Sequence, residues 1–315
     1  MRTRSKKNSR TPPLSIAGTA LSELMTFVEV SAAGLKNAAE ARQVLYWTRM
    51  AKKVLGESDP LSTEEHLHQA NERAQKLEAF AKGELKYGLP YLYGIASTRL
   101  WSILEAMVDD LLVYLLQFRP ECRGAEIIRK LEGPLVEFAT AKESDKAKYL
   151  ADLLIEQVKA RLKLGIGRFE STLKEIGMGG PVDSNVQKTI FELSQIRHVI
   201  IHRLGEADEK LINNCPWLNL RPGQKVRVTQ KDFNRYYLAF FWYMLELDRR
   251  LTALLSETRS EYKIKIHQEC LSELKAACST ANASNLPKIS QRKDKNNVRG
   301  GRASISRKKL SATEK

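Results

Sequence analysis

Cysteine is scarce in this sequence, with four in 315 residues. Their positions show neither the pairing typical of a disulfide framework nor the close clustering typical of a zinc site. His267, Cys270 and Cys278 lie near one another, but they lack a fourth partner at a usual spacing. We therefore expect free thiols in a reducing compartment, with no metal or other cofactor.

Long apolar runs are also absent. The longest, Tyr236–Leu245, falls far short of the ~20 residues that span a membrane. The apolar stretch after the basic N-terminus is interrupted by Glu23 and Glu29, which argues against a secretory signal. We therefore expect a cytoplasmic protein with no membrane partner.

Acidic residues are missing from the first 22 positions and rare in the last 37. Of the formal net charge of +15, residues 1–13 carry +5 and residues 279–315 carry +8. The body from Leu14 to Cys278 therefore contributes only +2, so the basic character belongs to the two ends. Such ends either attract RNA in a salt-dependent way or serve as solubilising flanks.

Helical spacing of apolar residues runs through most of the chain and predicts an all-α protein. Gly34 is expected to separate two helices in the N-terminal part, and Ser62-Thr63-Glu64-Glu65 carries the signal of a helix start. The predicted divisions are a disordered basic segment at 1–13, a helical extension at 14–84, a helical domain at 85–258, a terminal helix at 259–278 and a disordered basic tail at 279–315.

Within the helical domain, residues 90–117 are apolar over a wide arc, which predicts a central helix. Residues 225–228 alternate like a short strand, and Thr229 can cap the next helix, Phe233–Leu255. The aromatic run of that helix is more typical of a core or a dimer interface than of a base-stacking surface.

A basic motif interrupts the apolar helix predicted over Gln187–Leu204. Its six residues are Arg197-His198-Val199-Ile200-Ile201-His202. Arginine holds phosphate charge, and histidine can give or take a proton near neutral pH. His198 and His202, four residues apart, share a helix face, whereas Arg197 and His202 lie ~140° apart. One helix therefore predicts only half of a site, which a second copy across a twofold axis would complete.

These residue types suit RNA cleavage without a metal. An imidazole can accept the proton of the RNA 2′-hydroxyl, a second donor can protonate the leaving 5′-oxygen, and the guanidinium can stabilise the phosphate charge. The products would carry a 2′,3′-cyclic phosphate and a 5′-hydroxyl.

The segment from Glu192 to Gly205 resembles the signature helix of the HEPN superfamily, the higher eukaryotes and prokaryotes nucleotide-binding domains. That family's motif is Arg, a polar residue, three further residues and His. Arg197, His198 and His202 match it, although Asn is commoner at the second position, and this departure puts the proton-transfer arrangement in question. The resemblance covers roughly residues 85–255 and is specific around 190–205.

The resemblance implies an all-α, HEPN-like helical bundle with a short β-like hairpin before the last long helix. The N-terminal helical extension predicted from the helical spacing is not explained by the resemblance. It implies a homodimeric, metal-independent endoribonuclease, often a toxin with an antitoxin or an antiphage-defence effector. By position, Arg197, His198 and His202 would be catalytic. Glu105 matches an acidic residue often found on a neighbouring helix and would belong to the catalytic group as a supporting residue, and Arg203 is a candidate for substrate binding.

Other readings of the same residues stay open. The motif could be a basic helix surface, or an internal salt bridge to Glu105 or Asp109. The chain could then be a catalytically silent helical module that binds RNA, a nucleotide or a protein, or a structural dimeric scaffold.

Overall fold

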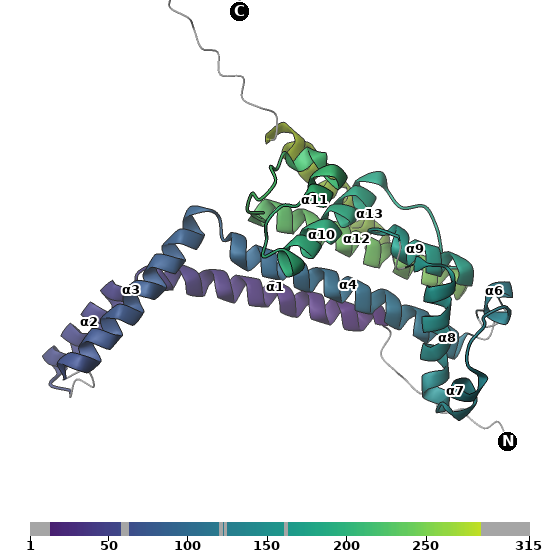
Figure 1. The fold of residues 1–315 in the computed structure, drawn as a ribbon, viewed down its shortest axis with the longest axis horizontal. Helices are drawn as coiled ribbons and strands as arrows, with labels where there is room; N and C mark the ends of the chain where they lie inside the picture. The colour runs from purple at the N-terminus through teal and green to yellow at the C-terminus, as the bar shows by residue number, and fades with distance from the viewer. Residues whose placement is uncertain (1–12, 58–62, 120–121, 123–124, 161–162, 285–315) are drawn as a thin grey trace, which may run out of the picture. The chain divides into compact units, whose positions relative to one another are not determined.

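The computed structural model of the chain describes residues 13–57, 63–119, 122, 125–160 and 163–284. The chain divides into two units, residues 1–285 and residues 286–315, and the second unit lies outside the described residues. The expected disorder of residues 1–12 and 285–315 therefore concerns residues outside the described part. The described part of the chain is all-α, as predicted from the helical spacing (Figure 1).

Helix α4, Pro90–Phe118, is the central element, as its wide apolar arc predicts. It begins with proline in its first turn, where a missing N–H costs nothing. One helix before it and three after it pack against it: α1 (Pro13–Ala38), α8 (Glu143–Gln157), α10 (Ser184–His202) and α12 (Gln230–Leu254).

Helix α1 runs through Gly34 without a break, so the predicted division at that residue is wrong. A single glycine costs a helix only about 1 kcal/mol, which the packing of α1 along α4 offsets. Among the described helices, α1 alone has the length and composition to cross a membrane, a test that core helices also pass. Its buried apolar residues are Leu14, Ala17, Leu21, Leu24 and Val28.

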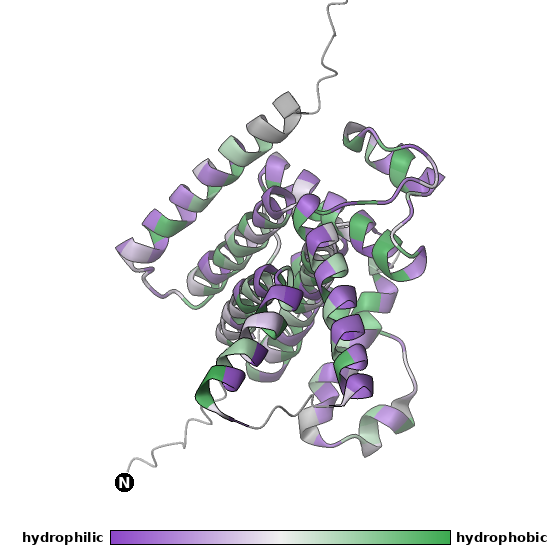
Figure 2. Cartoon of the chain, turned by 90° about the vertical axis from the view of Figure 1, so that its left-hand side faces the viewer, coloured by the Kyte–Doolittle hydropathy of each residue, from purple (hydrophilic) through white to green (hydrophobic). Residues whose placement is uncertain are grey.

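Helices α2 (Ala41–Leu55) and α3 (Glu64–Lys86) form a hairpin, and α3 also contacts α1. The predicted start of α3 is confirmed, because the Thr63 hydroxyl accepts a hydrogen bond from the His66 backbone N–H. Hydrophilic and hydrophobic residues alternate along the helices (Figure 2).

The short helices α6 (Glu126–Arg129), α7 (Leu135–Thr140) and α9 (Gly167–Leu173) lie between α4 and α10 in the sequence. α11 (Glu209–Asn214) and the 3-10 turns η2 (Lys174–Ile176) and η3 (Pro216–Leu218) flank α10. α12 carries the aromatic run, and its large side chains are buried in the core: Phe233, Tyr236, Phe240, Trp242 and Tyr243.

The predicted β-like hairpin is not found in the described residues. Glu206 and Lys225 form one isolated antiparallel bridge, and the Val226 N–H donates to the Gly205 carbonyl at 2.8 Å. Two turns limit this pairing to a few residues: Leu204 and Gly205 have positive φ, as does Gly223. The segment is therefore a looped connection into α12. Thr229 caps that helix, as predicted, in a reciprocal capping box with Asp232.

The last helix, α13 (Glu261–Ser284), continues beyond the predicted boundary at residue 278. Residues 279–284 were expected to belong to the disordered tail. They contain two alanines, Ala281 and Ala283, and alanine is the strongest helix former, which favours continuation of α13.

Candidate functional site

The basic motif occupies the last turns of α10. Arg197 and His198 are half-buried, whereas His202 is exposed. The two imidazole rings lie 4.9 Å apart between centroids with their planes at 50°, which confirms that they share a face. Both imidazoles are thus adjacent and reachable from solvent.

The guanidinium of Arg197 lies at the border of the buried face of α10. Its Nε is buried and has no hydrogen-bond partner among the described residues. Within the same part of the chain, no ion pair joins it to Glu105 or Asp109, so the internal salt bridge considered from the sequence is not found there. A guanidinium carries five N–H donors, and the one on Nε is left unsatisfied within the described residues.

Helix α10 ends in a tight turn directly after His202. The N–H groups of Arg203 and Gly205 both donate to the Val199 carbonyl, at 2.9 and 3.1 Å. Leu204 takes up the left-handed conformation at φ 52° and is 85% exposed. Together with exposed Ile201, it places apolar surface beside the motif.

The surroundings of the two histidines are basic. Burial lowers the pKa of His198, and the charges of Lys210, His202 and Arg203 lower it further, against an opposing effect of Asp208. A lowered pKa favours the neutral form of His198, the form that can accept a proton. Arg203 lies 3.6 Å from the Asp208 carboxylate, and its side chain is largely exposed.

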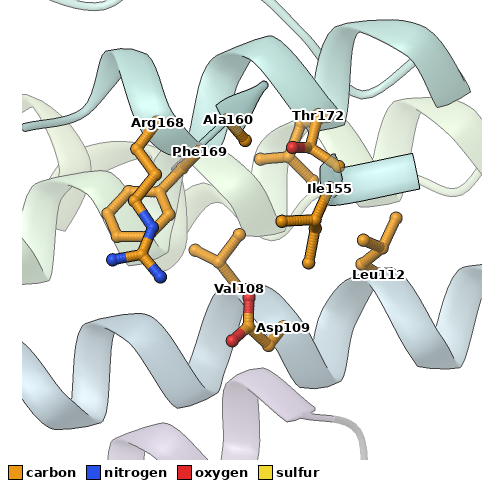
Figure 3. A pocket seen from close by; sticks show the side chains of 9 residues that line it. Val108, Asp109, Leu112, Ile155, Ala160, Arg168, Phe169 and Thr172 are labelled. Carbon is orange, nitrogen blue, oxygen red and sulfur yellow. The ribbon is translucent and has the colours of Figure 1, made fainter. Parts of the chain in front are cut away.

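Glu105 lies apart from the motif. Gly94 of α4 faces Ile200, and Glu105 lies eleven residues further along α4, about 16 Å along the helix axis. Its carboxylate pairs with the Arg168 guanidinium of α9. Arg168 and Asp109 line a small hollow beside this pair, between α4 and α9 (Figure 3). The structure thus brings His198 and His202 together, with Arg197 in the same turns of α10 and Glu105 apart from them.

A buried carboxylate anchors the motif helix. Glu192, five residues before Arg197, is fully buried on the apolar face of α10. It accepts hydrogen bonds from Arg235 Nη2 at 2.5 Å, from the Tyr236 hydroxyl at 2.7 Å and from Trp217 Nε1 at 2.6 Å. These contacts join α10 to α12 and to η3. Reasoning from the sequence missed this network. Its signal was the position of Glu192 seven residues before Val199, because residues seven apart lie on the same face of a helix.

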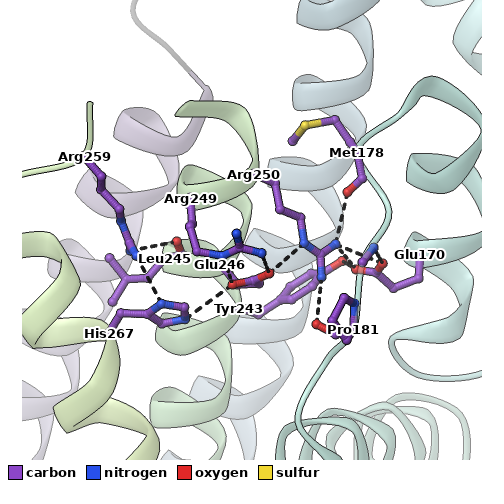
Figure 4. Close-up of polar contacts among 11 residues, drawn as sticks. Glu170, Met178, Pro181, Tyr243, Leu245, Glu246, Arg249, Arg250, Arg259 and His267 are labelled. Carbon is purple, nitrogen blue, oxygen red and sulfur yellow. Dashed lines mark hydrogen bonds and ion pairs between the residues drawn. The ribbon is translucent and has the colours of Figure 1, made fainter. Parts of the chain in front are cut away.

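A second network holds the segment that leads into α10 (Figure 4). Arg250 of α12 binds Glu170 at 2.8 Å and Glu246 at 2.9 Å, and it donates to the carbonyls of Met178 and Pro181. Asp183 then caps α10 by accepting from the Asn185 N–H. Charged side chains therefore hold both ends of the segment that precedes α10, Arg250 at Met178 and Asp183 at the start of the helix.

An open cleft of about 640 Å³ lies at the other end of α10 from the motif. Phe191 and Trp217 contribute aromatic walls, and Lys188 Nζ lies 4.4 Å from the centre of the Trp217 ring. Its polar lining includes Gln187 and Ser184. Aromatic walls with a few converging polar groups are typical of a small-molecule site.

The geometry thus offers two candidate sites on one helix, a histidine pair with an arginine at its end and an aromatic cleft near its start. Comparisons of the chain with protein-family models, with curated proteins and with solved structures find no match.

Proposed function

We propose that this chain is a metal-independent endoribonuclease whose active site forms between two copies. The observation that carries the proposal is at the end of α10: the two imidazoles lie 4.9 Å apart, and Arg197, whose buried Nε has no partner among the described residues, directly precedes the first of them in the sequence. The resemblance of residues 192–205 to the HEPN signature supports the same assignment.

The histidine pair suits a reaction that needs one base and one acid. The charge of His202 lowers the pKa of His198, so the pair disfavours two protons at once. One imidazole accepts the proton of the 2′-hydroxyl as the 2′-oxygen bonds to phosphorus. A protonated imidazole gives a proton to the 5′-oxygen as the bond from phosphorus to that oxygen breaks.

Arg197 would stabilise the charge that develops on the phosphate oxygens during this displacement. Arg203 is positioned one residue after His202 and would attract the RNA backbone. Glu105 has a different place in this proposal, because its carboxylate pairs with Arg168. It would help to hold α9 against α4 rather than contact the substrate.

A second copy is part of the proposal. Exposed Ile201 and Leu204 supply apolar surface next to the motif, where a partner could pack. Two motif helices across a twofold axis would join both arginines and both histidine pairs in one cleft. We propose a cytoplasmic enzyme of this type, acting as a toxin held by an antitoxin or as an antiphage-defence effector.

Cleavage of RNA in EDTA tests the mechanism. Wild type should yield 2′,3′-cyclic phosphate ends, whereas Arg197→Ala and His202→Ala should lose about 100-fold or more in rate. Arg73→Ala and His66→Ala, on exposed positions of α3, are matched controls that should cleave normally. Strict dependence on a metal, or full activity of either motif variant, would exclude this mechanism. Activity per chain should also fall on dilution.

The aromatic cleft favours a second candidate function, a catalytically silent module that binds a nucleotide. The base would stack on Trp217, and Lys188 would contact the phosphate. Binding of ATP or GTP, measured by calorimetry, should then weaken in Trp217→Ala and persist in His202→Ala. RNA turnover that disappears in His202→Ala would favour the nuclease instead.

A further inference from the structure

Helix α2 presents its apolar face to solvent. Trp47 is 59% exposed and Val54 is 84% exposed, and no residue of this helix is buried. The other exposed apolar side chains of α2 are Val44, Tyr46, Met50 and Leu55. A continuous apolar surface of this kind on a helix marks a place where a partner binds.

The opposite face of α2, which packs on α3, is mixed, with Ala41 and Leu45 half-buried there. Arg49 and Lys52 are half-buried on that side. Arg42 binds the Glu78 carboxylate at 2.7 Å, and Lys82 binds the same carboxylate. The hairpin is thus held partly by charges, whereas Trp47 and Val54 of α2 remain largely exposed.

The exposed residues follow the spacing of a helix-pairing seam. Val44, Trp47, Ala51 and Val54 are separated by three, four and three residues, the a/d pattern of a coiled coil. The pattern is also symmetric about residue 49. In an antiparallel pair of identical helices, Trp47 would face Ala51 of the other copy and Val44 would face its Val54. In each copy, the large indole of Trp47 would therefore meet the small methyl group of Ala51 from the other copy.

We infer that α2 pairs antiparallel with α2 of a second copy of this chain. Charge supports this occupant. The residues flanking the seam, Gln43, Thr48 and Met50, are uncharged, so two basic helices would meet without repulsion. An anionic lipid surface fits less well, because the residues beside the seam are uncharged, Arg49 and Lys52 are half-buried, and Arg42 is already paired with Glu78. This contact is independent of the proposed nuclease activity.

Cysteine cross-linking of the full chain tests the antiparallel register. The double variant Val44→Cys/Val54→Cys should cross-link two chains. Each single variant should not, because like residues would lie ~15 Å apart along the seam. A mixture of the two single variants should restore one cross-link. Wild type is the background control, since Cys122, Cys215 and Cys270 are buried and any link through half-buried Cys278 would appear there as well. A cross-link in an unmixed sample of either single variant, or no cross-link in the double variant, would overturn the pairing.

The seam itself is tested by Trp47→Glu. The variant should halve the molar mass measured by light scattering and raise the dissociation constant of the pair about 30-fold or more. Lys53→Glu, on the side away from the seam, is the control and should keep the wild-type mass. Equal far-UV circular dichroism would show that the variant is folded. An unchanged mass, or binding to phosphatidylserine vesicles that Trp47→Glu abolishes without a change in mass, would refute the inference.

Discussion

At the scale of single residues, the carboxylate of Glu192 shows how a charge can belong inside an apolar helix face. Four donor groups from Arg235, Tyr236 and Trp217 surround it, and Arg235 is itself buried. Burial of either charge alone would be costly, but the pair satisfies both. The motif five residues later in the same helix therefore rests on a fixed support.

Replacement of Glu192 by alanine should lower the free energy of unfolding by about 3–5 kcal/mol, because Arg235 would remain buried without its partner. Chemical denaturation measures this loss. The control is Glu126→Ala, which removes an exposed pair with Lys130 and should cost no more than about 1 kcal/mol. If Glu192→Ala lowered the free energy of unfolding no more than Glu126→Ala does, solvent would be shown to reach Arg235.

At the scale of elements, the α2–α3 hairpin depends on a titratable group. Hydrogen bonds from Arg42 and then Lys82 lower the pKa of Glu78 to about 2, against the opposing effect of burial. A carboxylate with a lowered pKa stabilises the folded form above its ordinary pKa, and that contribution is lost as the pH falls through the lowered value. The hairpin should therefore loosen in acid before the core does.

Hydrogen exchange of α2 amides measures this loosening. Between about pH 4.5 and pH 2, protection of α2 should fall relative to protection of α4, after correction for the intrinsic rate. In Glu78→Gln the relative protection should be low already at pH 6 and should change little with acid. A variant that keeps the full pH response would assign the titration to another group.

At the scale of the whole molecule, the two ends carry most of the excess charge. Residues 1–12 hold +5 and residues 286–315 hold +8 of the total of +15. Helix α13 reaches Ser284, so a trimmed chain of residues 13–285 keeps every described helix. This allows the ends to be removed while all described elements are retained.

Trimming to residues 13–285 should weaken binding to a 2′-O-methyl single-stranded RNA, which cannot be cleaved by 2′-hydroxyl attack. For each RNA phosphate that the ends no longer neutralise, the slope of log affinity against log salt should become shallower by about 0.7. Fluorescence anisotropy across a salt series measures both effects, with thermal unfolding as the control for folding. Undiminished affinity at low salt would mean that the ends are solubilising flanks.

Local features were predictable from the sequence because they depend on residues close together in the chain. The helical spacing predicted an all-α protein, the caps at Thr63 and Thr229 followed from their side chains, and the spacing of four predicted that His198 and His202 share a face. The strand-like alternation at 225–228 misled, since a strand needs a partner and the flanking turns leave room for one bridge.

Sequence alone therefore determined the helices, their caps and the pairing of the two histidines, through propensity and periodicity within one or two turns. Tertiary structure decided which charges meet: Glu105 with Arg168 rather than with the motif, and Glu192 with Arg235. It also decided that the apolar face of α2 points outward, because the choice of partner depends on how distant helices pack together. A local pattern can place a carboxylate on a buried helix face, as at Glu192, but its partner lies 43 residues away in the chain and is set by tertiary packing.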